Sequence, residues 1–160
     1  MSVTREYQAL GKKRVNHIVA HWTQGEAFDV GQPGQMTVRI DGMKQTGPGP
    51  VDMLLSALAT CSAIDVVSIM NKRRTPLASL DIDVRGERAT TVPAKLTSIA
   101  IIYRMTGEGI DRESAERAID LALNKYCSVR DSLDPAIPIE WTLVLNEERN
   151  ATKAATGSVA

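Results

Sequence analysis

The segment from Pro50 to about Lys72 limits the fold more than any other part of this chain. It is apolar on nearly every side of a helical projection; Gly47, Pro48 and Gly49 precede it and Pro76 follows it. Proline suits the first position of a helix, because its missing N–H would have no intrahelical partner there. A helix without a polar side has to be covered by other elements. The sequence therefore predicts a long helix through the middle of a domain or a dimer. Small residues that would let neighbours approach it closely are Ser56, Ala57, Ala59, Ser62 and Ala63.

Short segments with strand-like patterns surround this helix. Strands are expected at residues 15–22, 27–30 and 36–40 before it, and two more follow, one around Leu80 to Val84 and one at 97–105. A second helix, capped by Asp111, is expected to end near Tyr126, before a short turn capped by Ser128 and a last strand at 137–145. The order is three strands, helix, two strands, helix, strand. It indicates an α+β fold, because a parallel nucleotide-binding sheet would need strands and helices in alternation.

Length and composition favour one soluble domain. The 160 residues are 43% hydrophobic and 24% charged, and 19 basic side chains balance 19 acidic ones, so no net charge attracts nucleic acid or an anionic membrane. We expect residues 1–14 to be a polar leader, 15–146 a single domain and 147–160 a disordered tail. The first ten residues lack the apolar stretch of a signal peptide, which favours a cytoplasmic protein.

Cys61 and Cys127 are the only cysteines, and each lies in a segment expected to be helical. They have neither the spacing of a zinc site nor that of a thioredoxin motif, so only the fold can bring them together. Two interpretations follow. The thiols are a redox pair, in which one attacks an oxidant and the other resolves the sulfenic acid, or they are two buried, inert apolar residues. In a reducing compartment, a disulfide between them would be transient.

The surroundings of the cysteines give further expectations. Cys127 precedes a short helical turn and lies near Lys125 and Arg130, so we expect its pKa to be lowered. Asp65 lies four residues after Cys61 on the same helix face, where it either forms a nearby hydrogen bond or points to solvent. His17 and His21 share a strand face but lack a third ligand. We expect no metal and no cofactor.

Two motifs resemble those of the OsmC/Ohr family of bacterial stress proteins. Residues 48–55 and 59–67 resemble the Pro-x-x-Leu-Leu…Ala-x-Cys helix of that family, and Cys127 falls where the family places its second cysteine. The order of elements agrees over about residues 15–146. The resemblance implies an intertwined homodimer, with antiparallel sheets wrapped around long central helices and a site at the subunit interface. In the peroxidase members the first cysteine attacks an organic hydroperoxide, the second resolves it, and a dithiol such as a lipoyl group supplies electrons.

The chain departs from that pattern near both cysteines. Peroxidase members carry a Glu directly after the proline that starts the helix, where this chain has Val51 followed by Asp52. They also carry an Arg in the first hairpin turn, where residues 24–26 stand here, and a proline after the second cysteine. That Arg activates the thiolate and binds the Glu, so another cation such as Arg39 would have to replace it.

Two functions follow from the resemblance and the residues. The first is a cysteine-based peroxidase or reductase of organic hydroperoxides or related electrophiles in oxidative-stress defence. In it Cys61 attacks and Cys127 resolves, with Asp52 and Arg39 as supporting residues. The second is a non-catalytic protein that holds a small hydrophobic ligand at the dimer interface. A Cys61→Ser change separates them, because only the first function depends on that thiol.

Overall fold

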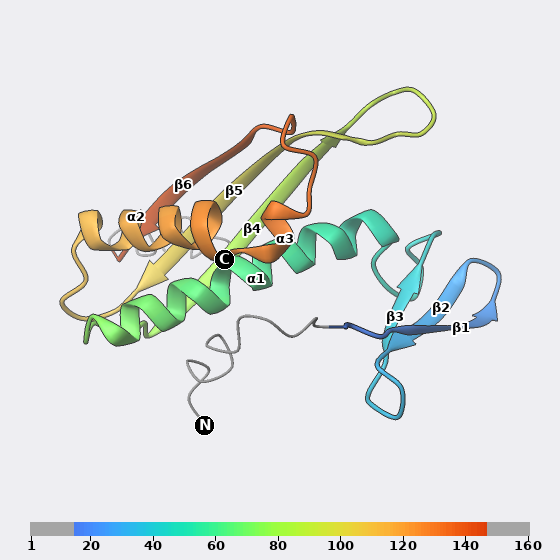
Figure 1. The fold of residues 1–160 in the computed structure, drawn as a ribbon, viewed down its shortest axis with the longest axis horizontal. Coiled ribbons are helices and arrows are strands. Elements are labelled where there is room, and N and C mark those ends of the chain that lie inside the picture. The colour runs from blue at the N-terminus through green and yellow to red at the C-terminus, as the bar shows by residue number, and fades with distance from the viewer. Residues whose placement is uncertain (1–14, 147–160) are drawn as a thin grey trace, which may run out of the picture. The chain divides into compact units, whose positions relative to one another are not determined.

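A computed structural model of the chain describes residues 15–146. They form two compact units, one within Met1–Pro50 and one within Val51–Ala160, and each is described by itself (Figure 1). The expected leader at 1–14 and tail at 147–160 lie outside the described residues.

The first unit is a small antiparallel meander. Strands β1 (Val19–Gln24), β2 (Ala27–Gly31) and β3 (Val38–Asp41) pair in the order β1-β2-β3. Gly25 adopts a φ of 52° in the turn between the first two strands, a conformation that glycine reaches without strain. The registers place Trp22 opposite Phe28, and Phe28 opposite Ile40, so one face of this sheet is apolar.

That apolar face is largely uncovered. Trp22 is 66% exposed, and Phe28 and Val38 are also exposed. Among the described residues of this unit only Ala27, Asp41 and Gly49 are buried. A three-stranded sheet needs a packed apolar face to be stable, so this sheet requires a cover.

The second unit contains the hydrophobic core. Strands β4 (Ser79–Arg88), β5 (Leu96–Thr106) and β6 (Ile139–Leu145) form a sheet in the order β4-β5-β6. The helices α1 (Pro50–Lys72) and α2 (Arg112–Leu121) lie across this sheet (Figure 1). Alternate residues of β5 are buried from Ile99 to Met105, while those between them are more exposed. Both helices therefore pack on one face of the sheet.

Helix α1 buries a single stripe. Leu58, Ser62, Val66 and Met70, spaced by four residues, are its buried side chains, as expected for one face of a helix. On other sides Ile64 is 64% exposed. By length and composition alone α1 would also suit a membrane span, but its buried stripe belongs to the core of the second unit. Among the described residues of the second unit, α1 is thus covered on one side only.

The predicted α+β order is confirmed, including the limits of α1. Asp111 caps α2 as expected, since its side chain accepts a hydrogen bond from the Ser114 N–H. The expectation of antiparallel sheets holds for the first sheet and for the β4–β5 pair, whereas β5 and β6 run parallel. The chain after β5 crosses the sheet through α2 before β6 begins, and such a crossover allows parallel pairing.

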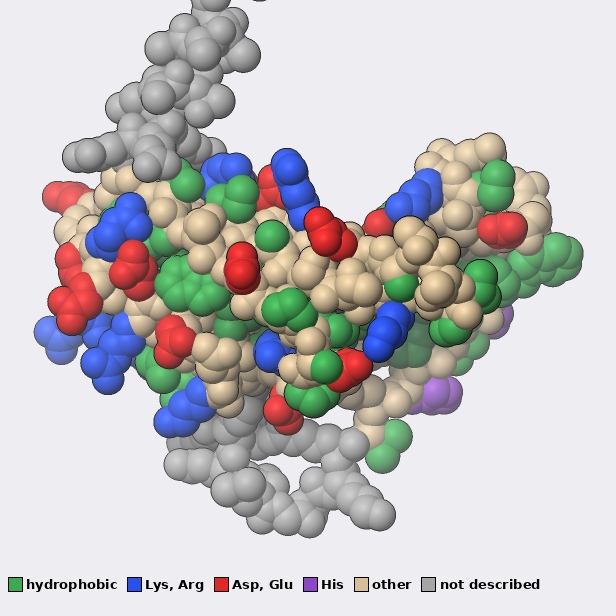
Figure 2. Space-filling view, turned by 90° about the horizontal axis from the view of Figure 1, so that it is seen from above, with side chains coloured by type: hydrophobic (Ala, Val, Ile, Leu, Met, Phe, Trp, Pro, Cys, Tyr) green, Lys and Arg blue, Asp and Glu red, His purple; other side chains and the backbone are tan. Residues whose placement is uncertain are grey.

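Basic and acidic side chains are interspersed on the molecular surface. On the face shown in Figure 2, Lys and Arg side chains alternate with Asp and Glu side chains, and hydrophobic side chains reach the surface between them. No large patch of one sign appears on that face. This agrees with the equal numbers of acidic and basic residues in the sequence.

Candidate functional site

The fold brings the two cysteines together from separate elements. Cys61 lies in the middle of α1 and is partly buried, whereas Cys127 lies directly before α3 (Ser128–Asp131) and is 3% exposed. The Cys61 side chain acts on the pKa of Cys127 both as a hydrogen-bond partner and as a charge. The two thiols are therefore neighbours, which spacing in the sequence could not establish.

A π-helical turn places Cys127. The residues Ala122–Tyr126 form this turn, η2, and the Cys127 N–H donates to the Ala122 carbonyl over 2.9 Å. Single π turns are frequent at functional sites, because the extra residue re-aims the side chains that follow. Here the turn ends α2 at the core, where Leu123 and Cys127 are both buried.

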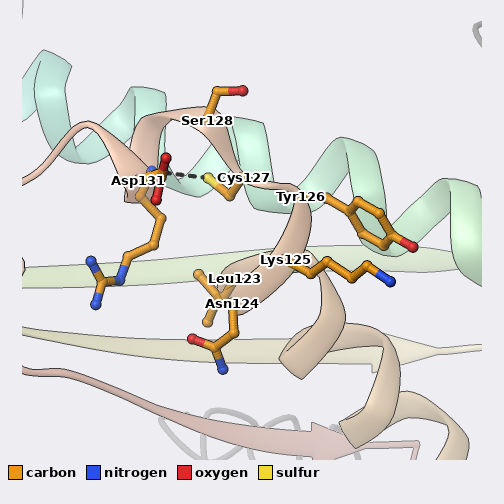
Figure 3. Close-up of a pocket in the computed structure, with 8 residues that line it drawn as sticks. Leu123, Asn124, Lys125, Tyr126, Cys127, Ser128 and Asp131 are labelled. Carbon is orange, nitrogen blue, oxygen red and sulfur yellow. Dashed lines mark hydrogen bonds between the residues drawn. The ribbon is translucent and has the colours of Figure 1, made fainter. Parts of the chain in front are cut away.

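The sulfur of Cys127 caps α3. It accepts a hydrogen bond from the Arg130 N–H at 3.3 Å (Figure 3). The sequence suggested Ser128 for this role, and that prediction is wrong: Ser128 is the first helical residue, and the cap lies one position earlier. Two hydrogen bonds consequently fix the position of Cys127: its N–H donates to the Ala122 carbonyl, and its sulfur accepts from the Arg130 N–H.

The pKa of Cys127 moves in the direction opposite to the one expected from the sequence. Burial raises the pKa of this thiol to about 11, the Arg130 N–H lowers it, and the hydrogen bond and charge of Cys61 raise it further. A thiolate in an apolar site loses its hydration, and a four-residue helix offers little compensation. The prediction of a lowered pKa is therefore wrong, and Cys127 is a neutral thiol near pH 7.

A buried hydroxyl pair lies beside the thiols. The Tyr103 hydroxyl of β5 donates to Ser62 Oγ over 2.8 Å, and Ser62 follows Cys61 directly in α1. Burial raises the pKa of Tyr103 to about 12, the bond to Ser62 lowers it, and the charge of Cys127 raises it. Sequence reasoning missed Tyr103. The available signal was a tyrosine at a core position of an apolar strand, because a buried hydroxyl needs a partner.

A pocket opens next to Cys127. Its volume is about 230 Å³. Figure 3 shows Lys125 and Tyr126 on one side of Cys127 and Asp131 on the other. The Lys125 ammonium lies 5.4 Å from the centre of the Tyr126 ring. The residues that line the pocket are Leu123, Asn124, Lys125, Tyr126, Cys127, Ser128, Arg130 and Asp131.

Asp52 and Arg39, the two residues expected to support the Cys61 thiolate, lie in different elements. Asp52 is half-buried in the first turn of α1, on the order of 14 Å along the helix from Cys61. Arg39 belongs to the first unit, where its guanidinium binds Asp29 on the neighbouring strand β2. The carboxylate holds the pKa of Arg39 above its usual range. The roles of Asp52 and Arg39 at Cys61 stay predictions.

Asp65 is a partly buried carboxylate on the apolar helix α1. Within residues 15–146 it forms neither a hydrogen bond nor an ion pair, so the sequence alternative of a nearby hydrogen bond is not realised there. Desolvation raises its pKa, and the charge of Lys72 lowers it less strongly. The charged form of Asp65 is consequently disfavoured by folding.

We expect Asp65→Asn to stabilise the protein at neutral pH. The pKa of Asp65 is higher in the folded protein than in the unfolded chain. The contribution of Asp65 to the free energy of unfolding is therefore fully present below the unfolded-state pKa and is lost as the pH rises through the folded-state pKa. The variant should therefore melt slightly above the wild type at pH 7, and the difference should shrink toward pH 4. Thermal melts across this range measure it, with exposed Asp120→Asn as control. A variant that melts lower at pH 7 would mean that the Asp65 carboxylate has a favourable partner.

The geometry supports thiol chemistry in particular. Two thiols lie together, one partly accessible and one buried, and a small polar pocket adjoins the buried one. In the described part of the chain, no three His, Cys, Asp or Glu side chains gather as metal ligands. Thiol–disulfide exchange needs two sulfurs and access for a partner, and this arrangement offers both.

Comparison with known proteins gives the family. A family model described as "OsmC-like protein" matches residues 42–142. Protein YhfA of Escherichia coli strain K12 is 34% identical over 119 residues, which are 74% of this chain and 89% of YhfA. The crystal structure of an OsmC-like protein from Mycoplasma pneumoniae aligns with a TM-score of 0.73 at 18% identity, covering 84% of this chain and 99% of that one. The organic hydroperoxide resistance protein OhrB of Bacillus subtilis aligns with a TM-score of 0.54 at 15% identity, covering 81% and 96%.

The two solved structures share the fold of this chain, and at 18% and 15% sequence identity the similarity concerns the fold alone. The family model covers more than half of the chain, and it includes both Cys61 and Cys127. The order of elements is the one that the resemblance implied. The chain belongs to the OsmC-like family.

Proposed function

We propose that this protein is a cysteine-based peroxidase that reduces organic hydroperoxides or related electrophiles, with Cys61 as the attacking and Cys127 as the resolving thiol. The observation that carries the proposal is the proximity of these two thiols, which come from α1 and from the residue before α3 and pack against the same hydrophobic core. Distant relatives in fold include organic hydroperoxide resistance proteins. A reducing compartment such as the cytoplasm would keep both thiols free between turnovers.

The reaction divides between the two thiols. The Cys61 thiolate attacks a peroxide oxygen, the O–O bond breaks, and the alkoxide takes a proton and leaves as an alcohol, which leaves Cys61 as a sulfenic acid. Cys127 then attacks the Cys61 sulfur, and a disulfide and water form. A dithiol reductant returns both cysteines to thiols and is itself oxidised to a disulfide.

The protonation of Cys127 supports this division of roles. With a pKa of about 11, Cys127 is almost wholly protonated near pH 7 and is a poor first nucleophile. Once Cys61 is a sulfenic acid, however, its sulfur is an electrophile next to the Cys127 thiol. The high local concentration of this electrophile compensates for the small fraction of Cys127 that is thiolate. Asp52 and Arg39 are the candidates that would support the Cys61 thiolate in place of the usual Glu and Arg.

We also propose that a second copy of the chain covers the apolar surfaces. Helix α1 exposes Leu54, Ile64 and Val67, and the first sheet exposes Trp22 and Val38. On each unit, exposed apolar side chains of this kind mark an interaction site. OsmC-like proteins are typically dimeric, and two central helices packed together inside the sheets would bury these side chains.

An Ile64→Glu change should break this dimer. A carboxylate buried without a partner in an apolar interface costs about 3 kcal/mol or more, which corresponds to a loss of at least about a hundredfold in dimer affinity. Light scattering during size-exclusion chromatography should show dimers for the wild type and monomers for the variant. Val92→Glu is the control, because Val92 is 98% exposed in the loop after β4. A wild-type monomer, or a dimeric Ile64→Glu variant, would contradict the proposed interface.

One observation favours a second function. A buried Cys127 whose pKa is about 11 is also what an inert thiol would show, and the exposed apolar side of α1 offers contacts for a hydrophobic molecule. The alternative is a non-catalytic protein that holds such a ligand at the dimer interface.

Thiol titration distinguishes the two functions. Free thiols are counted in the purified protein before and after one equivalent of cumene hydroperoxide, and the products are identified by mass spectrometry. The peroxidase function predicts rapid loss of two thiols and a disulfide between Cys61 and Cys127. Two unreacted thiols would overturn it and favour the binding function. The Cys127→Ser variant is the matched control, since it should stop at a sulfenic acid on Cys61.

A further inference from the structure

Asp65 is the carboxyl side chain within one turn of Cys61 on α1. Residues four apart in a helix lie on the same face, with Cβ atoms about 5–6 Å from each other. Helical side chains also lean toward the N-terminus of the helix, which for Asp65 is the direction of Cys61. Both side chains are partly buried. Asp65 thus presents its carboxyl group on the face of α1 that carries the attacking thiol.

The carboxyl group of Asp65 has no structural partner in the described part of the chain. It forms neither a hydrogen bond nor an ion pair within residues 15–146. Burial raises its pKa, and the charge of Lys72 lowers it less strongly. A desolvated carboxyl group without a partner costs stability, and such groups are found at functional sites more often than elsewhere. The raised pKa favours the protonated form, which is the form that donates a proton.

The two hydroxyl groups adjacent to Cys61 in the sequence already donate to other acceptors. Thr60 Oγ1 donates to the Ser56 carbonyl over 2.8 Å, and Ser62 Oγ donates to the Ala59 carbonyl over 3.0 Å. Both protons are therefore used within α1. Neither hydroxyl has a free proton to give to a molecule at the Cys61 sulfur.

The first step of peroxide reduction needs a proton donor. A thiolate that attacks one oxygen of a hydroperoxide expels the other as an alkoxide, which is a strong base and is stabilised by a proton as it forms. The leaving oxygen lies one O–O bond beyond the oxygen that the sulfur attacks. A suitable acid consequently lies beside the sulfur without bonding to it, as Asp65 does.

We propose that Asp65 is the general acid of this step and protonates the leaving alkoxide. This deepens the proposed peroxidase function and rests on it. The Cys61 thiolate forms the S–O bond, the electron pair of the O–O bond passes to the leaving oxygen, and the proton of Asp65 converts that oxygen into an alcohol. The Asp65 carboxylate then regains a proton from solvent. Carboxyl groups that apolar surroundings keep protonated serve as general acids in other enzymes.

The base strength of the leaving group tests this role. In the Cys127→Ser background the reaction stops at the sulfenic acid on Cys61, and mass spectrometry follows its formation with cumene hydroperoxide or with peracetic acid. The first oxidant expels an alkoxide, whereas the second expels acetate, a weak base that needs no proton. We expect Asp65→Asn to slow the reaction with cumene hydroperoxide about a hundredfold and the reaction with peracetic acid less than about threefold.

Two further variants are the controls. Asp65→Glu keeps an acid at the same position and should restore part of the rate with cumene hydroperoxide. Asp120→Asn, an exposed change on α2, should leave both rates unaltered. Because Asp65→Asn is expected to melt slightly above the wild type, unfolding would not account for its slower reaction, and thermal melts of each variant check this.

The two oxidants separate the role of Asp65 from the peroxidase function. Equal slowing of both reactions in Asp65→Asn, or no slowing of either, would overturn the role of Asp65 while the peroxidase function stands. If cumene hydroperoxide leaves Cys61 unoxidised in the Cys127→Ser protein that retains Asp65, the peroxidase function fails and the role of Asp65 fails with it.

Discussion

Replacing Cys61 with serine should abolish peroxide consumption. The change removes the atom that forms the first bond to oxygen, and a serine hydroxyl at this position has no base to activate it, so turnover should fall by at least about a thousandfold. Consumption of cumene hydroperoxide with a dithiol as reductant measures the effect. Serine and cysteine are nearly equal in shape, and Cys61 is only partly buried in α1, so the Cys61→Ser variant should keep the fold.

The matched variant is Cys127→Ser, which keeps the attacking thiol. It should consume one equivalent of peroxide in a burst and then slow, because its sulfenic acid lacks the neighbouring thiol that resolves it. The two variants thus differ in the burst and not only in steady-state turnover. Retained turnover in Cys61→Ser would refute the assignment of Cys61. A full burst in both would mean that the peroxide is reduced elsewhere in the protein.

Met70→Ala should cost about 2–5 kcal/mol of unfolding free energy. Met70 is the last member of the buried stripe of α1 and is fully inaccessible. Truncation removes its contacts in the core and leaves a cavity that the surrounding sheet and helices fill only in part. For a protein of marginal stability this is a large share of the total. Urea unfolding followed by circular dichroism gives the loss as a shift in midpoint.

Met36→Ala is the control for Met70→Ala, since Met36 is 94% exposed in the segment before β3. The same atoms are removed there without a cavity, so we expect a change within about 0.5 kcal/mol. Similar losses in both variants would mean that the core of the second unit is packed more loosely than its burial indicates. A much larger loss at Met36 would reveal that this side chain is covered in the assembled protein.

The sequence predicted those elements whose causes are local. Helix α1 has the limits expected from its apolar run, Pro50 at its start and the polar residues at its end, and Asp111 caps α2 as its position suggested. Strand limits were less accurate: the first strand begins at Val19 and not near residue 15. The start of a strand depends on where its neighbour can pair with it, and β1 pairs with β2 only from Val19 onward.

Around Cys127 the local signals were misleading. Nearby basic residues and a helix start favoured a lowered pKa, yet burial raises it to about 11. The π turn over Ala122–Tyr126 also has no clear local signature. It shifts the cap of α3 from Ser128 to the sulfur of Cys127. Desolvation and the path of the chain through the core are set by contacts with distant residues, which no short window of sequence contains.

Local signals in the sequence were enough to predict the order of strands and helices and the central helix that carries Cys61, because hydrophobic period, prolines and caps act over a few residues. The expectation that Cys127 also lies in a helical segment was wrong, since its backbone is extended between η2 and α3. The tertiary structure decided which thiols and hydroxyls meet. Cys61 and Cys127, like Ser62 and Tyr103, come from elements far apart in the chain. It also decided that β6 runs parallel to β5 and that the described residues of the second unit cover α1 on one side only, since both depend on how the helices pack across the sheet.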